Sequence, residues 1–130
     1  MPHRRCRGER GAAVVDFVLV LLVVVPLFLG ILQVGLVLHV RNTLTSAASE
    51  GARYAATVDR PVDAGAARTR EQIGGALAGR FARDVTARPA DVHGAPGVEV
   101  EVVAVVPPLG LWGPGVRIAV TGHAVEETAP

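Results

Sequence analysis

The residue with the clearest capacity for chemistry is Asp16, an acid at the start of a long apolar run. From Phe17 to Leu38 the sequence reads FVLVLLVVVPLFLGILQVGLVL, in which Gln33 is the only polar side chain. If this run crosses a membrane, a carboxylate at its edge is costly unless water, headgroups or a partner reaches it. Two interpretations stay open: water and the helix N-terminus stabilise the acid, or the acid pairs with another group.

The other residues that could support chemistry are scattered along the chain. No histidine is spaced with a second ligand for a metal ion, and neither serine has a nearby base for nucleophilic catalysis. The one cysteine precedes the apolar run, so the rest of the chain must be stable without a disulfide. These residues are His3, His39, His93, His123, Ser46, Ser49 and Cys6. We therefore expect no enzymatic activity, no metal or other cofactor and no small-molecule substrate.

Charge is distributed unevenly along a chain that is 50% hydrophobic and has a formal net charge of +1. Residues 1–11 carry four arginines against one glutamate, and residues 12–40 carry Asp16 as their only formal charge. Residues 41–130 carry nine arginines against ten acids. This near-neutral part of the chain has no basic patch of the kind that binds nucleic acid, so we expect no nucleic-acid partner.

The apolar run is long enough to cross a membrane. A helix over 17–38 would be about 33 Å long, whereas a hydrocarbon core is about 30 Å thick. The arginines before the run favour a cytoplasmic N-terminus. We therefore predict a basic cytoplasmic leader over 1–11, a transmembrane helix over 12–40 and an extracytoplasmic domain over 41–130, in a single-pass protein of the cell membrane. A cleavable signal peptide is a competing interpretation, but the run exceeds the usual apolar region of about 7–15 residues and no A-x-A site follows it closely.

The helical pattern continues beyond the apolar run. Small and apolar residues repeat at helical spacing along one narrow face, formed by Val40, Leu44, Ala47, Ala48, Gly51, Ala55 and Val58. One continuous helix over 12–58 is expected, because Asp59-Arg60-Pro61 ends it. A second helix is predicted over 63–85, with Asp63 as its N-cap. Its apolar stripe, which would dock on the first helix, is Ile73, Leu77, Phe81 and Val85.

The C-terminal part of the chain has the pattern of a β-hairpin. Residues 86–97 contain two prolines and two glycines and are predicted to form a loop. Apolar alternation over 98–106 and 116–121 predicts two antiparallel strands. Trp112 lies between them and would either anchor the connection to the hairpin or contact a partner. Because a lone hairpin is marginal in water, the helices or a partner chain must cover it. The predicted fold class is therefore α+β: a long transmembrane helix extending into an amphipathic helix, a second helix and a C-terminal hairpin.

The order of these features resembles type IV prepilins and pseudopilins, in which a basic head, a glycine, an acid five positions later and a long apolar helix follow one another. Gly11 and Asp16 occupy the glycine and acid positions. More specifically, residues 10–57 are similar to the TadE-like proteins of the tight-adherence (Flp) pilus system. The similarity is carried above all by Gly30-Ile31-Leu32-Gln33 and Glu50-Gly51-Ala52-Arg53-Tyr54-Ala55-Ala56.

The resemblance implies a pilin-like fold, with other pilin-like subunits and pilus assembly proteins as partners. It also implies that a prepilin peptidase cuts between Gly11 and Ala12. Asp16 would then pair with the new α-amino group of a neighbouring subunit and set the register between helices. The chain departs from the family at two positions: the family favours Glu where Asp16 stands, and it often has an acid where Gln33 stands.

These observations predict a TadE-like minor pilin or pseudopilin. It would be a structural, non-enzymatic component of the cell envelope that supports assembly of a tight-adherence pilus or a related secretion machinery. The alternative is a membrane-anchored extracytoplasmic interaction module without a pilus role. A protein secreted after signal cleavage is a third interpretation.

Overall fold

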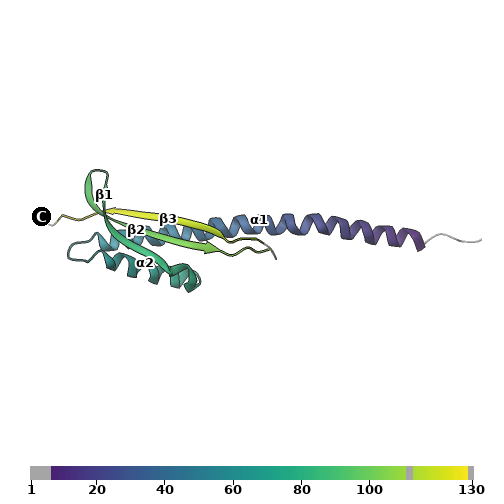
Figure 1. Cartoon of the computed structure of the whole chain (residues 1–130), viewed down its shortest axis with the longest axis horizontal. Helices are drawn as coiled ribbons and strands as arrows, with labels where there is room; N and C mark the ends of the chain where they lie inside the picture. The colour runs from purple at the N-terminus through teal and green to yellow at the C-terminus, as the bar shows by residue number, and fades with distance from the viewer. Residues whose placement is uncertain (1–6, 111–112, 129–130) are drawn as a thin grey trace, which may run out of the picture.

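The computed structural model describes residues 7–110 and 113–128, so Trp112 lies outside the described residues. A long helix carries a small α+β domain on its C-terminal half (Figure 1). The elements follow one another as α1 (Arg7–Ala55), α2 (Asp63–Ala76), the 3₁₀-helix η1 (Gly79–Ala82), β1 (Asp84–Val92), β2 (Ala95–Val106) and β3 (Val116–Val125). The predicted α+β class is confirmed, although the sheet has three strands where a hairpin of two was predicted.

α1 is one helix of 49 residues that runs through Pro26 without interruption, which makes it about 74 Å long. It begins at Arg7, ahead of the predicted start at residue 12. It ends at Ala55 instead of residue 58, because the chain turns there: the Thr57 hydroxyl donates to the carbonyl of Tyr54 at 2.6 Å, and Asp59 has a positive φ of 65°. The predicted end near Arg60-Pro61 is therefore correct to within one helical turn.

α2 is shorter than predicted. It ends at Ala76, directly after Gly74 and Gly75, and Leu77 is already extended. The prediction of a helix over 63–85 was therefore wrong beyond residue 76, because two adjacent glycines lower helix stability by about 1 kcal/mol each relative to alanine. The burial of the predicted stripe is confirmed: Ile73, Phe81 and Val85 are buried in the core and Leu77 packs against it. Asp63 is the first helical residue and Val62 is the N-cap, so the predicted cap was wrong.

β1 occupies most of the segment that was predicted to be a loop, and that prediction was wrong. The sheet order is β1-β2-β3, entirely antiparallel, which makes β1 an edge strand. Pro89 lies inside β1 opposite Val98. Proline is tolerated there because an edge strand leaves alternate N–H groups without a ladder partner. β1 and β2 are joined by His93 and Gly94, which both have positive φ, as the tight two-residue hairpin turn requires.

The core lies between the inner face of the sheet and the two helices. Of the narrow face predicted on α1, all members are buried except Val58, which follows the end of the helix and is 43% exposed. β2 contributes every second residue, and β3 contributes Ile118 and Val120. The arginine Arg70 on α2 donates to the carbonyl of Val85 at 2.7 Å and ties the helix to β1. Alanines form most of the α1 side of this core, whereas valines form most of the sheet side.

Candidate functional site

The N-terminal half of α1 is an apolar surface with no cover in the described part of the chain. Between Val14 and Leu38 nearly every large hydrophobic side chain is exposed, with Leu22 at 71%. The helix is long and apolar enough to cross a membrane, and its most apolar window has no buried residue. Soluble proteins rarely expose an apolar surface of this extent. Together with the family match given below, these features fit a single-pass membrane protein.

The predicted processing and pairing residues all lie on this exposed part of α1. Gly11, Ala12 and Asp16 are exposed, and a Cβ added to Gly11 would meet nothing within 4 Å. Asp16 has no hydrogen bond or ion pair to any residue within 7–110 or 113–128. The Gly11–Ala12 bond lies inside the first turns of α1.

A shallow apolar notch interrupts the same surface near its middle. It is lined by Pro26, Leu27, Gly30, Ile31 and Val34 and has a volume of about 420 Å³. Gly30 leaves open space where a side chain would stand. In membranes, small residues of this kind let a second helix approach closely. The exposed half of α1 therefore offers both an acid and a recess to another helix.

The predicted family-motif residues Glu50–Tyr54 lie at the opposite end of α1, within the folded domain. Asp16 and Glu50 are separated by about 50 Å along the helix axis, so the two groups of predicted residues do not form one site. Gly51 and Ala52 are buried, whereas Glu50 is half-buried and Arg53 and Tyr54 are exposed. Glu50 and Arg53 form an ion pair at 4.0 Å, one helical turn apart.

Gly51 and its neighbours bring α1 and α2 into backbone contact. A Cβ on Gly51 would lie 1.9 Å from Oγ1 of Thr69 and 2.6 Å from the carbonyl oxygen of Gly65. Thr69 is completely buried, and its hydroxyl lies 2.8 Å from the Gly65 carbonyl oxygen and 3.3 Å from that of Ala47. On the other side of α1, Gly122 of β3 lies against the backbone of Ala48. Sequence reasoning missed Thr69 and Gly122, because only the fold shows which backbones meet.

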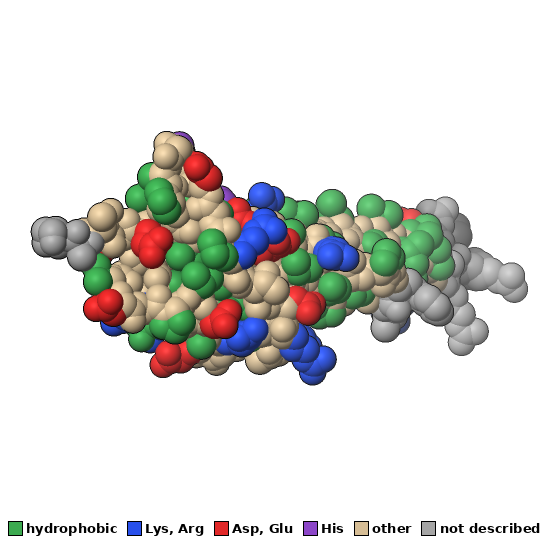
Figure 2. Space-filling model, turned by 60° about the vertical axis from the view of Figure 1, so that its left-hand side comes forward, with side chains coloured by type: hydrophobic (Ala, Val, Ile, Leu, Met, Phe, Trp, Pro, Cys, Tyr) green, Lys and Arg blue, Asp and Glu red, His purple; other side chains and the backbone are tan. Residues whose placement is uncertain are grey.

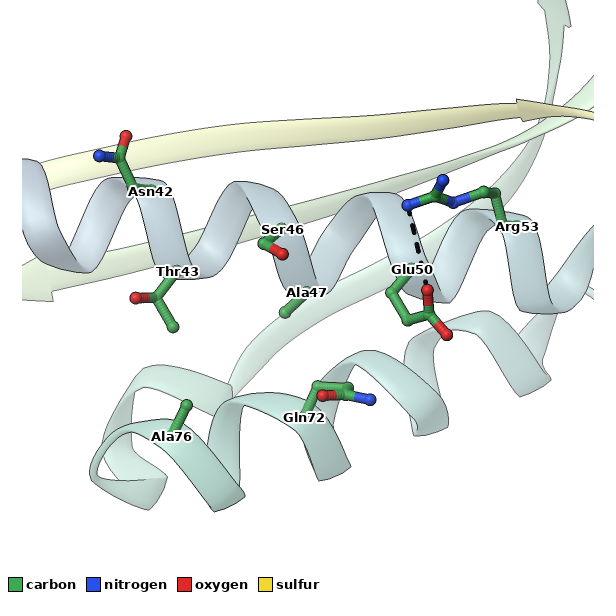
Figure 3. A pocket seen from close by; sticks show the side chains of 8 residues that line it. All are labelled: Asn42, Thr43, Ser46, Ala47, Glu50, Arg53, Gln72 and Ala76. Carbon is green, nitrogen blue, oxygen red and sulfur yellow. Dashed lines mark ion pairs between the residues drawn. The ribbon is translucent and has the colours of Figure 1, made fainter.

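A polar groove runs between α1 and α2 beside this contact (Figure 3). Its volume is about 520 Å³, and the two helices face each other across it. The lining residues are Asn42, Thr43, Ser46, Ala47, Glu50, Arg53, Gln72 and Ala76. Hydroxyl, amide and charged groups of this kind can bind a polar segment of a partner. Tyr54 contacts the turn that follows α1: the guanidinium of Arg60 lies 3.7 Å from its ring centroid, which is a cation–π contact.

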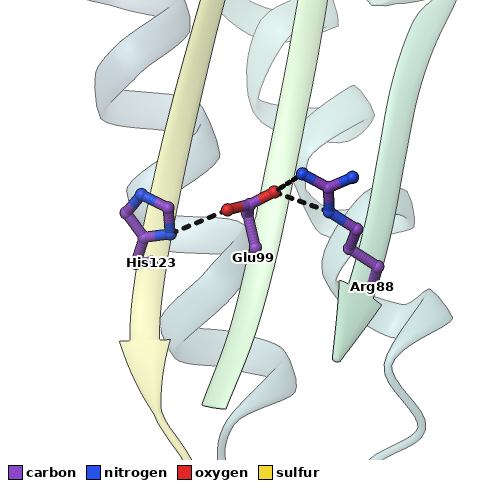
Figure 4. A network of polar contacts seen from close by, with 3 residues as sticks. All are labelled: Arg88, Glu99 and His123. Carbon is purple, nitrogen blue, oxygen red and sulfur yellow. Dashed lines mark hydrogen bonds and ion pairs between the residues drawn. The ribbon is translucent and has the colours of Figure 1, made fainter. Parts of the chain in front are cut away.

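The outer face of the sheet carries a charged cluster that joins all three strands (Figure 4). Glu99 of β2 accepts hydrogen bonds from Arg88 of β1, with Nε at 2.6 Å from Oε1. Nδ1 of His123 on β3 lies 3.3 Å from the second carboxylate oxygen. Arg88, Glu99 and His123 are direct cross-strand partners. Pairs of this kind stabilise a sheet by about 0.2–1 kcal/mol each, so a structural role accounts for the cluster.

Gln33 has a role that its isolated place in the apolar run did not reveal. Its side-chain oxygen accepts a hydrogen bond from the backbone N–H of Leu109 at 2.7 Å. Its nitrogen donates to the carbonyl of Pro107 at 3.3 Å. The connection between β2 and β3 is thereby attached to α1 at a level well inside the apolar run. The contact spans more than half of the chain, so spacing along the sequence gives no signal for it.

The exposed apolar helix and the fold fit a single-pass membrane protein that carries an α+β domain on the C-terminal half of α1. Residues 11–53 match the model of a family described as TadE-like protein, which confirms the resemblance over that segment. The match covers Asp16, Gln33 and Glu50–Arg53, and supports a general association with the tight-adherence pilus. Comparison with curated proteins and with solved structures found no match. The second helix and the sheet lie outside the matched segment.

Proposed function

We propose that the protein is a minor pilin or pseudopilin that supports assembly of a tight-adherence pilus or a related secretion machinery. It acts as a structural component and not as an enzyme. The observation that carries the proposal is the coincidence of two features on α1: the TadE-like match over residues 11–53, and a bare apolar surface that bears a single acid. Such a helix can leave the bilayer only if other apolar helices replace the lipid.

In this proposal the leader stays in the cytoplasm and the α+β domain lies outside the membrane. A prepilin peptidase cuts between Gly11 and Ala12 and creates an α-ammonium group at Ala12. Asp16 of one subunit then pairs with that cation on a neighbouring pilin-like subunit. In a low-dielectric helix bundle each charge would be costly alone, so their pairing favours one axial register over others. Asp16 is exposed and open to such a partner.

The position of the mature N-terminus distinguishes this proposal from a membrane-anchored module without a pilus role. Protein purified from its own cells should begin at Ala12, because cleavage creates the cation that Asp16 requires. Mass spectrometry of the intact protein, with N-terminal sequencing, measures this directly. A strain without its prepilin peptidase is the control and should yield the chain with residues 1–11 attached. A mature chain that retains these residues in the wild-type strain would favour the anchored module.

A further inference from the structure

The described residues of the connection between β2 and β3 lie beside the apolar half of α1. Gln33 bonds both Pro107 and Leu109, and Figure 1 shows this end of the sheet reaching along α1 away from the rest of the domain. We call the described residues 105–110 and 113–116 the hairpin tip. Its large side chains Val105, Leu109 and Val116 are exposed.

The level of Gln33 on α1 places the hairpin tip at membrane depth. If the hydrocarbon core begins at Asp16, about 30 Å of core is crossed by about twenty helical residues, which reaches residue 36. Gln33 then lies roughly 5 Å inside the boundary on the side of the folded domain. Folded residues cover α1 from Leu36 and Val37 onward, so the tip is the part of the domain that extends furthest toward the bilayer.

The composition of the hairpin tip and of the residues next to it fits this depth. From Val102 to Val116 the sequence contains no charged residue, and Glu101 and Arg117 bound it. Arg117 is exposed, at a place where an arginine can reach lipid headgroups while its stem stays in apolar surroundings. Figure 2 shows the charged side chains of the visible face concentrated on the folded domain, with hydrophobic side chains prominent along α1.

The backbone of the tip is also adapted to a place with little water. Backbone polar groups inside a bilayer need partners within the protein. Pro107, Pro108 and Pro114 have no N–H to satisfy. The N–H of Leu109 and the carbonyl of Pro107 are both bonded by Gln33. Gln33, a polar residue in the apolar run, thus satisfies two backbone groups of the tip at that depth.

We propose that the hairpin tip inserts into the lipid leaflet on the side of the folded domain and contacts the upper acyl chains. The domain would then be held to the membrane at two places, α1 and the tip, which fixes its tilt on the bilayer. This inference rests on α1 crossing a membrane and not on the proposed pilus role. Lipid is favoured over a protein partner because the tether to Gln33 places the tip beside a membrane-spanning helix.

A spin label at Leu109 tests the proposal in the full chain reconstituted into phosphatidylcholine vesicles. Cys6 is replaced by serine, and Leu109→Cys carries a nitroxide. Val125→Cys is the matched control, because Leu109 and Val125 are similarly exposed, at 44% and 49%, at opposite ends of the sheet. Collision rates are measured with oxygen, which concentrates in lipid, and with a neutral nickel complex, which stays in water. The label at 109 should favour oxygen, whereas the label at 125 should favour nickel.

Gln33→Leu in the same labelled chain tests the tether. This change removes both hydrogen bonds and keeps the run apolar, so the oxygen preference at position 109 should fall toward the value at position 125. An unchanged preference would reject the tether. A label at 109 that favours nickel as strongly as the control would overturn lipid insertion. A label shielded from both reagents and broadened by a second label would also overturn it, in favour of a second copy of the chain. Either result, with a mature N-terminus at Ala12, would leave the proposed function intact.

Discussion

Replacing Gly122 with alanine is expected to destabilise the folded domain by about 3 kcal/mol, the upper part of the range for overpacked cores. A Cβ at this position would lie 2.3 Å from the carbonyl carbon of Ala48, 2.4 Å from the nitrogen of Ser49 and 2.5 Å from the carbonyl oxygen of Ala48. All three atoms belong to the backbone of α1, so no side-chain rotation can relieve the overlap. The strand and the helix must separate, which disturbs the core between them.

Thermal unfolding of the detergent-solubilised protein, followed by circular dichroism, measures this effect. The loss should lower the Tm of the domain by roughly 10–20 °C. Gly74→Ala is the matched control, because Gly74 lies in the interior of α2 and its added Cβ meets nothing within 4 Å. That change should leave stability unchanged or raise it by up to about 1 kcal/mol, since alanine favours the helix. Equal Tm values for the two variants would contradict the close packing of β3 on α1.

Replacing Asp16 with alanine is expected to prevent incorporation of the protein into pilus assemblies while leaving it in the membrane. Removing one partner of a buried ion pair costs about 3–5 kcal/mol. Such a loss lowers association with neighbouring subunits by at least about a hundredfold. Membrane insertion should persist, because the apolar run from Phe17 to Leu38 is unchanged and loses only a charge at its edge.

The experiment compares Asp16→Ala, Asp16→Asn and Asp16→Glu in the native cell. Co-purification with pilin-like subunits measures incorporation, and resistance to carbonate extraction measures insertion. Asp16→Asn keeps the size of the side chain without its charge and should fail like the alanine variant. Asp16→Glu restores the acid that the family favours and should incorporate normally. Full incorporation of the alanine variant would refute the pairing role of Asp16.

Most of the helical architecture could be predicted from local patterns in the sequence. The narrow face from Val40 to Ala55 marks the docking side of α1, because each turn of a buried helix must present small or apolar residues there. The additional strand, β1, could not be predicted in this way. Pro89 and Gly94 are loop signals, yet β1 is an edge strand that accommodates proline and is joined to β2 by a turn that requires glycine.

The residues of the candidate site could also be predicted only in part. Gly11, Asp16 and the motif Glu50–Tyr54 could be recognised from short stretches of sequence. All of them except Tyr54 lie within residues 11–53, which match the family model. The partners of these residues inside the domain depend on contacts between distant segments. Gly51 meets Thr69, and Gln33 meets Leu109. The sequence around a glycine or a glutamine does not show which distant backbone will pack against it. These contacts could therefore be identified only from the fold.

The most direct test of the proposed function is to delete the gene in its own cell and count surface pili by electron microscopy. The deletion strain should assemble none, and expression of the wild-type chain from a plasmid should restore them. The plasmid-borne Asp16→Glu variant should restore pili as well, whereas Asp16→Ala should not. A deletion strain with as many pili as the wild type would contradict a role of this protein in pilus assembly.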